Sequence, residues 1–105
     1  MEEIVVDGIS YELDKDGFLD ETSDWNENIA IALAKKEGVG ELTEEHWKVI
    51  RYLRSYYDEF GISPIPRKFY KETGYSKKSI IELFPAGLQN GAFKISGLAN
   101  PTGCI

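Results

Sequence analysis

Cysteine, histidine and methionine each occur only once in the 105 residues of this sequence. A single cysteine excludes an internal disulfide and any cysteine-rich zinc cluster. No set of histidine, cysteine and carboxylate residues has metal-ligand spacing and no glycine-rich phosphate loop follows a strand, so we expect neither a metal ion nor a cofactor. No apolar run approaches the roughly 18 residues that a membrane span needs. The acidic start, MEEIVVDG, lacks the basic and then apolar pattern of a signal peptide. These absences predict a single-domain cytoplasmic protein with no membrane partner.

The charge of the chain is divided between its two halves. The net charge is −6, yet residues 1–45 hold 14 acidic and 3 basic side chains, whereas residues 46–105 hold 4 acidic and 9 basic ones. Five of the twelve bases fall within twelve positions, namely Arg67, Lys68, Lys71, Lys77 and Lys78. This cluster is either a solvated helix face or a local basic patch, and the second reading leaves room for a polyanionic partner.

The first twenty residues have the pattern of a β-meander. Asp7-Gly8 is a typical hairpin turn, and Ile9, Tyr11 and Leu13 then alternate with polar residues, as in a half-buried strand. A second turn over residues 14–17 is followed by Phe18 and Leu19, where we expect a third short strand. A meander of this size needs helices to pack against.

Four helices are expected after the meander. The first begins near Trp25, with residues 22–24 as candidate N-caps, and ends before Gly38. The second runs from the N-cap Thr43 to Phe60 and is the most amphipathic element. The third and fourth span residues 67–73 and 77–84, and the short turn between them makes a helix-turn-helix-like pair. His46, in the first turn of the second helix, is interpreted as a helix-start residue and not as a ligand or base.

The C-terminal stretch is rich in glycine, proline and asparagine. One helical turn is expected around residues 88–93, and nothing beyond Gly97 predicts regular structure. We therefore expect a globular domain over residues 1–96 and a mobile arm over residues 97–105 that is dispensable for folding.

The only cysteine, Cys104, is the next-to-last residue of this arm. A structural cysteine normally fills a core, which the tip of an arm does not offer, so we weigh a chemical role against chance placement. The reactive form of cysteine is the thiolate. The terminal carboxylate disfavours it, so an activating cation must come from Lys94, Arg67 or Lys68, or from a partner.

Three stretches carry a resemblance to a known family. They are the tail GAFKISGLANPTGCI with ELFPAG before it, the segment EGVGELTEEHWKVIRYLRSYYDEFGISP, and the segment DGISYELDKDGFLDETSDW. Together they resemble the DsrC/TusE family, which includes the gamma subunit of dissimilatory sulfite reductase and the TusE sulfurtransferase. The resemblance implies an α+β fold, in which a β-meander packs on four to five helices, and a sulfur-handling role for Cys104. It also implies that Pro101, Thr102 and Gly103 help to bind partners.

The sequence departs from the family pattern at informative positions. Phe93 stands where DsrC proper has a second arm cysteine, so the arm cannot close an internal disulfide. Asn100 stands where a lysine is usual. The stretch KETGYSKKSIIELFP has the shorter form of sulfite-reductase members, whereas the cysteine count matches TusE.

Three functions follow from the resemblance and the charge pattern. The first is a cytoplasmic sulfur carrier of the sulfurtransferase type, with a persulfide on Cys104 and protein partners as sulfur donor and acceptor. Its pathway stays open between tRNA thiolation, sulfite reduction and sulfur oxidation. The second is a binding subunit of a sulfite reductase, with Phe93 anchoring the arm. The third and weakest is a DNA-binding regulator that uses Lys77 and Lys78. We expect a monomer, or a disulfide dimer through Cys104 after oxidation.

Overall fold

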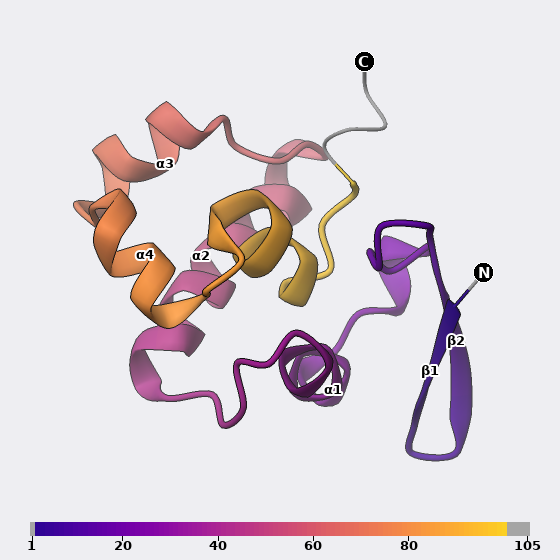
Figure 1. The fold of residues 1–105 in the computed structure, drawn as a ribbon. Helices are drawn as coiled ribbons and strands as arrows, with labels where there is room; N and C mark the ends of the chain where they lie inside the picture. Colours follow the sequence, from indigo (N-terminus) through magenta and orange to yellow (C-terminus); the bar gives the residue numbers. More distant parts are fainter. Residues whose placement is uncertain (1, 101–105) are drawn as a thin grey trace.

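The computed structural model describes residues 2–100, which form an α+β fold with a two-stranded antiparallel sheet and a set of helices (Figure 1). The elements in chain order are β1 (Glu2–Val6), β2 (Ile9–Leu13), the 3₁₀ turn η1 (Thr22–Asp24), α1 (Glu27–Lys36), α2 (Glu44–Phe60), α3 (Pro66–Thr73), α4 (Lys77–Leu83) and the π-helical segment η2 (Leu88–Phe93). The hairpin lies beside α1 at one end of the molecule, and α3 and α4 lie at the other (Figure 1). The expected fold class is confirmed.

The hairpin forms where the sequence predicts it. Asp7 and Gly8 have φ values of 53° and 79°, as a type I′ turn requires, and Val6 pairs with Ile9. The expected third strand is wrong, because only an isolated bridge joins Leu19 to Leu13. Phe18 and Leu19 instead bury their side chains in the core.

The start of the first helix also differs from the expectation. Residues 22–24 form η1 instead of capping a helix, and the N-cap is Asn26, whose side chain accepts a hydrogen bond of 3.0 Å from the Ile29 amide. Trp25 therefore lies before the helix in an extended conformation. This placement frees its indole to pack against the C-terminal part of the chain.

The long helix α2 has the expected boundaries. Thr43 is its N-cap, and Gly61 ends it in the left-handed conformation. His46 Nδ1 accepts from the Thr43 amide at 3.0 Å, and its Nε2 lies 2.8 Å from the Leu83 carbonyl oxygen. Because a carbonyl only accepts, Nε2 carries the proton. His46 thus caps α2 and ties it to α4, which agrees with its interpretation as a helix-start residue.

The helix-turn-helix-like pair is present with small shifts at its ends. α3 begins one residue earlier than expected, at Pro66, which is well suited to the first helical position. α4 ends one residue earlier, at Leu83, because Phe84 becomes extended and turns its ring into the core.

The segment η2 occupies the centre of the helical part (Figure 1). The apolar residues from this region with buried side chains are Leu88, Ala92, Phe93, Ile95 and Leu98. They pack in one cluster with apolar residues of the hairpin, α1, α2, α3 and α4. Between residues 2 and 100, no helix is both long and apolar enough to cross a membrane.

Candidate functional site at the base of the C-terminal arm

The predicted reactive residue, Cys104, lies outside the described residues, as do Pro101, Thr102 and Gly103. The structure does describe the chain up to Asn100, directly before this segment. The candidate site is therefore built around the last described residues, 96–100, which we call the arm base.

The arm base begins with a helix C-cap. The Leu98 amide donates to the Phe93 carbonyl and the Gly97 amide donates to the Lys94 carbonyl, both at 3.1 Å, with Gly97 at a φ of 73°. This is the Schellman arrangement, which the sequence indicates by a glycine followed by an apolar residue. It reverses the chain sharply at the end of η2 and places Leu98 beside Phe93.

Trp25 packs against this turn. Its Nε1 donates a hydrogen bond of 2.9 Å to the Ile95 carbonyl oxygen. A Cβ atom on Gly97 would lie only 2.3 Å from Trp25 Cδ1. Only glycine therefore fits at position 97, both for its positive φ and for the close approach of the indole.

Arg54, on α2, joins the arm base to the N-terminal half of the chain. Its Nη1 donates to the Gly97 carbonyl at 3.2 Å, and its Nη2 donates to the Thr22 carbonyl at 2.9 Å. Its Nε forms an ion pair with Asp58 at 3.2 Å. The guanidinium also lies over the ring of Trp25, 5.1 Å from the centroid. The half-buried guanidinium of Arg54 thus donates both to a carbonyl of the helix end, where backbone acceptors lack intrahelical amide partners, and to a carbonyl of η1.

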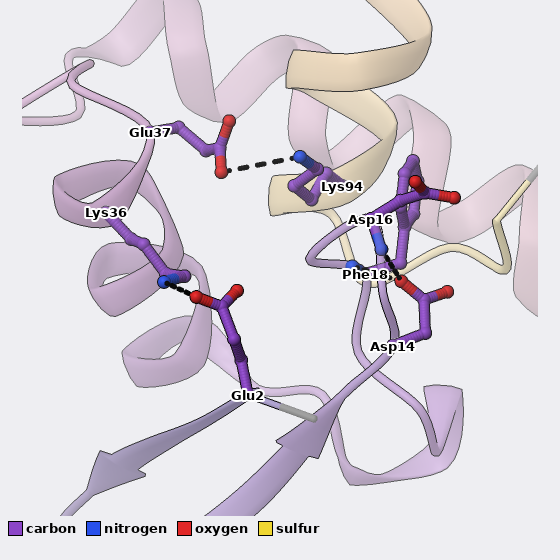
Figure 2. A network of polar contacts seen from close by, with 7 residues as sticks. All are labelled: Glu2, Asp14, Asp16, Phe18, Lys36, Glu37 and Lys94. Carbon is purple, nitrogen blue, oxygen red and sulfur yellow. Dashed lines mark hydrogen bonds and ion pairs between the residues drawn. The ribbon is translucent and has the colours of Figure 1, made fainter.

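Asn100, the last described residue of the chain, is hydrogen-bonded to the turn after β2. Its Nδ2 donates to Asp14 Oδ2 at 3.1 Å and to Asp16 Oδ2 at 2.7 Å. Asp14 Oδ1 in turn accepts from the amides of Asp16 and Phe18, as Figure 2 shows. At this position, where the resemblance leads one to expect lysine, the uncharged asparagine donates one hydrogen bond to each of two carboxylates.

Lys94 is buried in the domain and pairs with a side chain at the end of α1. Its Nζ pairs with Glu37 Oε2 at 3.4 Å and lies 5.3 Å from the centroid of the Phe18 ring (Figure 2). Only 10% of its side chain is exposed. In this position Lys94 holds the turn before Phe18 and the end of α1 against η2, and its activation of a thiol stays a prediction.

Arg67 and Lys68 lie on α3, and the structure does not bring them together with Lys94. Lys68 pairs with Glu72 at 3.2 Å and lies over the Tyr56 ring. Tyr52 donates a hydrogen bond to the same carboxylate. This bond and Lys68 lower the pKa of Glu72, while burial and the carboxylate raise the pKa of Tyr52 to about 12.

Phe93 forms part of the core, with 1% of its surface exposed. Leu98, which the sequence assigns to the arm, is fully buried as well. The fold therefore continues to hold the chain beyond position 97, and removal of residues 98–105 would take one side chain out of the core. Sequence reasoning did not identify the residues that contact the arm base, namely Arg54, Trp25, Asp14 and Asp16. The signals that could have indicated such contacts are the asparagine at position 100 and the glycine cap at position 97.

No group of three or more metal-binding side chains gathers within residues 2–100. The arm base fixes the position of Asn100, the last described residue before the segment that holds the single thiol.

Comparisons with known proteins agree with this picture. Residues 5–105 match the family model described as DsrC like protein. The gamma subunit of the dissimilatory-type sulfite reductase of Nitratidesulfovibrio vulgaris is 40% identical over 105 residues, the whole of both chains. The sulfurtransferase TusE of Photorhabdus laumondii is 43% identical over 110 residues, covering 97% of each chain.

Two solved structures have the same fold. The oxidized gamma subunit of the sulfite reductase of Archaeoglobus fulgidus gives a TM-score of 0.87 at 42% identity, over 99% of this chain and all of that one. A chain in the crystal structure of dissimilatory sulfite reductase I gives a TM-score of 0.89 at 39% identity, with the same coverage.

Proposed function

The chain belongs to the DsrC family, and from this premise we propose that it is a sulfur carrier that takes up a persulfide sulfur on Cys104 and passes it to an acceptor. The observation that supports the proposal is the joint presence of the family match over residues 5–105 and a single thiol beyond the arm base. The relatives include both a sulfurtransferase and a sulfite reductase subunit, and both are sulfur-handling proteins by name.

The transfer step needs only one cysteine. The Cys104 thiol first loses its proton to solvent, and the thiolate attacks the outer sulfur of a donor persulfide. A new S–S bond forms at Cys104, the S–S bond of the donor breaks, and the donor leaves as a thiolate that takes up a proton. No net oxidation occurs, so the step requires no redox cofactor. Delivery repeats the same exchange in the opposite sense.

The packing around position 93 supports this one-cysteine mode. Phe93 is enclosed by the core and holds no sulfur, so a sulfur atom cannot be shared between two arm residues. Asn100 is held by Asp14 and Asp16, and the proposed carrier residue lies four positions further along the chain. Sulfur donor and acceptor are expected to be proteins.

A direct test measures the intact mass of the protein after incubation with inorganic polysulfide. We expect a gain of one sulfur atom that a reductant removes, and no gain in Cys104→Ser. Because this variant changes one atom outside residues 2–100, its folding should match that of the wild type. An adduct that survives in Cys104→Ser, or a wild type that takes up no sulfur, contradicts the carrier function.

A second candidate is a binding subunit of a dissimilatory-type sulfite reductase. The full-length identity of 40% with such a gamma subunit favours it. The two functions are compatible. If the reductase exchanges sulfur with Cys104, the chain is both a subunit that binds the reductase and a carrier of its sulfur. Phe93 is too enclosed to anchor the arm inside a partner, so any anchor must lie elsewhere on the surface.

A further inference from the structure

The hairpin leaves the outer edge of strand β1 open. Within residues 2–100, β1 pairs with β2 alone, and no other backbone group bonds to its second edge. In a hairpin with a two-residue turn, the residues that flank the turn, here Val6 and Ile9, form a hydrogen-bonded pair. The backbone groups of Glu3 and Val5 therefore point away from β2. An open edge of this kind is a template for a further strand.

A hollow of about 510 Å³ lies between β1 and α1. Residues 4–7 line one side of it, and Asn28, Ile31, Ala32 and Lys35 of α1 line the other, whereas its described lining includes no residue of β2. Figure 1 shows β1 as the strand of the hairpin nearer α1. An extended chain in this hollow would meet both the open backbone of a strand and the side of a helix, which suits strand addition.

Two exposed contacts hold β1 and α1 together near the two ends of the strand. Lys36 Nζ pairs with Glu2 Oε2 at 3.3 Å, as Figure 2 shows, and Asn28 Nδ2 donates to Asp7 Oδ2 at 2.9 Å. The strand and the helix thus have a set spacing before any partner binds. A preformed site of this kind lowers the ordering cost of binding.

The exposed face of the hairpin holds two carboxylates side by side. Glu3 lies directly opposite Glu12, and both side chains are exposed. Like charges directly opposite each other destabilise a sheet. In the part of the chain that the structure describes, neither carboxylate has a basic partner. A lysine or arginine opposite Glu3 on an added strand would relieve this repulsion.

The opposite face of the hairpin asks for apolar residues on the added strand. Successive side chains of a strand point to alternate faces, so the neighbours of that basic residue would lie on the same face as Ile4 and the buried Val6. On this side Ile31 of α1 lines the hollow and is 41% exposed. The occupant that fits is therefore an extended segment in which a basic residue stands between apolar ones.

The chain's own segments do not have this pattern. Strand β1 of a second copy reads EEIVV and would bring further carboxylates to Glu3. The last five residues, PTGCI, contain no basic side chain. Nucleic acid would be repelled by the same carboxylates, because its backbone is negatively charged. These arguments leave a different protein as the occupant.

We propose that the open edge of β1 and the adjoining side of α1 form a strand-addition site for an extended segment of a partner protein, in which a lysine or arginine stands between apolar residues. The site goes beyond the proposed function, because it uses neither Cys104 nor the arm base.

The test titrates the isotope-labelled full chain with the synthetic peptide acetyl-TIKIT-amide and measures the dissociation constant by NMR. Two peptides serve as controls: acetyl-TKIIT-amide, which has the same composition without the alternation, and the first peptide methylated at the lysine amide nitrogen. The protein variant is Val5→Pro, which removes an outward amide of β1. Its matched control is Ser10→Pro, because Ser10 lies directly opposite Val5, on the other edge of the hairpin.

We expect saturable binding of acetyl-TIKIT-amide that shifts the amide signals of Glu3 and Val5. Val5→Pro, or methylation of the peptide, should weaken binding about fivefold or more, since each removes a backbone hydrogen bond. Glu3→Gln should weaken it about twofold to fivefold, as loss of an exposed ion pair does. Ser10→Pro and Cys104→Ser should bind like the wild type, so the sulfur-carrier function is tested separately.

Four results would overturn the proposal. The wild type does not bind acetyl-TIKIT-amide saturably, or it binds acetyl-TKIIT-amide equally well, which would show attraction by charge alone. Val5→Pro and Ser10→Pro weaken binding equally, or the wild type forms a dimer that Val5→Pro converts to a monomer, which would show that a second copy covers the edge. If both proline variants unfold, the methylated peptide decides on the wild type, and equal affinity for both forms of the peptide overturns the proposal.

Discussion

The strongest test of the arm base is to separate Leu98 from the residues that follow it. Leu98 is fully buried and belongs to the same apolar cluster as Phe93, whereas residues 101–105 lie beyond the last described residue. We expect Leu98→Ala to destabilise the protein strongly and to leave sulfur loading of the folded protein intact. Deletion of residues 101–105 should have the opposite pattern, with stability retained and loading lost.

The magnitude follows from the burial of the side chain. Truncating a fully buried leucine to alanine costs about 2–5 kcal/mol of unfolding free energy. A domain of this size has roughly 5–15 kcal/mol in total, and each kcal/mol shifts the melting temperature by about 4–8 °C. Leu98→Ala should therefore lower the melting temperature by at least about 8 °C. The deletion of residues 101–105 removes no described core residue, so its shift should stay below about 4 °C.

The assay is thermal unfolding followed by circular dichroism, with urea unfolding as a second measure of the free energy. Ala99→Gly serves as a control, because Ala99 is adjacent but only half-buried. If deletion of residues 98–105 and deletion of residues 101–105 gave the same melting temperature, Leu98 would contribute nothing to the core. In that case the arm would begin at residue 97 as the sequence predicts, and the reasoning from burial would be refuted.

Four further predictions concern single side chains. Gly97→Ala should cost at least about 2 kcal/mol, from the positive φ and the clash with the indole beside it; a melting temperature unchanged within error contradicts this packing. Ser96→Ala should raise the melting temperature, because the buried Ser96 hydroxyl has no hydrogen-bond partner among residues 2–100; a fall would reveal a partner. The raised pKa of Tyr52 favours its neutral form in the folded state. The contribution of Tyr52 to the free energy of unfolding is therefore complete below pH 10 and is lost as the pH rises toward 12. Tyr52→Phe removes the hydrogen bond to Glu72, so the unfolding midpoints of this variant and of the wild type should converge over that pH range. If the two midpoints instead changed in parallel with pH, the result would argue against this bond. Oxidation should give a disulfide dimer that non-reducing gels detect in the wild type and not in Cys104→Ser, and a dimer in the variant is incompatible with a single-thiol link.

Much of the local structure was predictable because its causes are local. The Asp7-Gly8 turn, the Thr43 cap of α2 and the glycines that end α2 and α3 depend on backbone preferences of a few neighbouring residues. The family was also recognisable, since the motif around Cys104 is a contiguous stretch of sequence. These features do not require knowledge of how distant segments pack.

The sequence by itself predicted the reactive residue, because the single cysteine can be read directly from it. It also showed that no second thiol stands at Phe93. Only the tertiary structure decided that Leu98 belongs to the core, that Lys94 pairs with Glu37, and that Arg54 links Gly97 to Thr22. These contacts join residues that are 32 to 57 positions apart, and no periodicity in the sequence encodes them. They arise because burying the centre of the chain around η2 leaves specific carbonyls and charges that only distant side chains can satisfy.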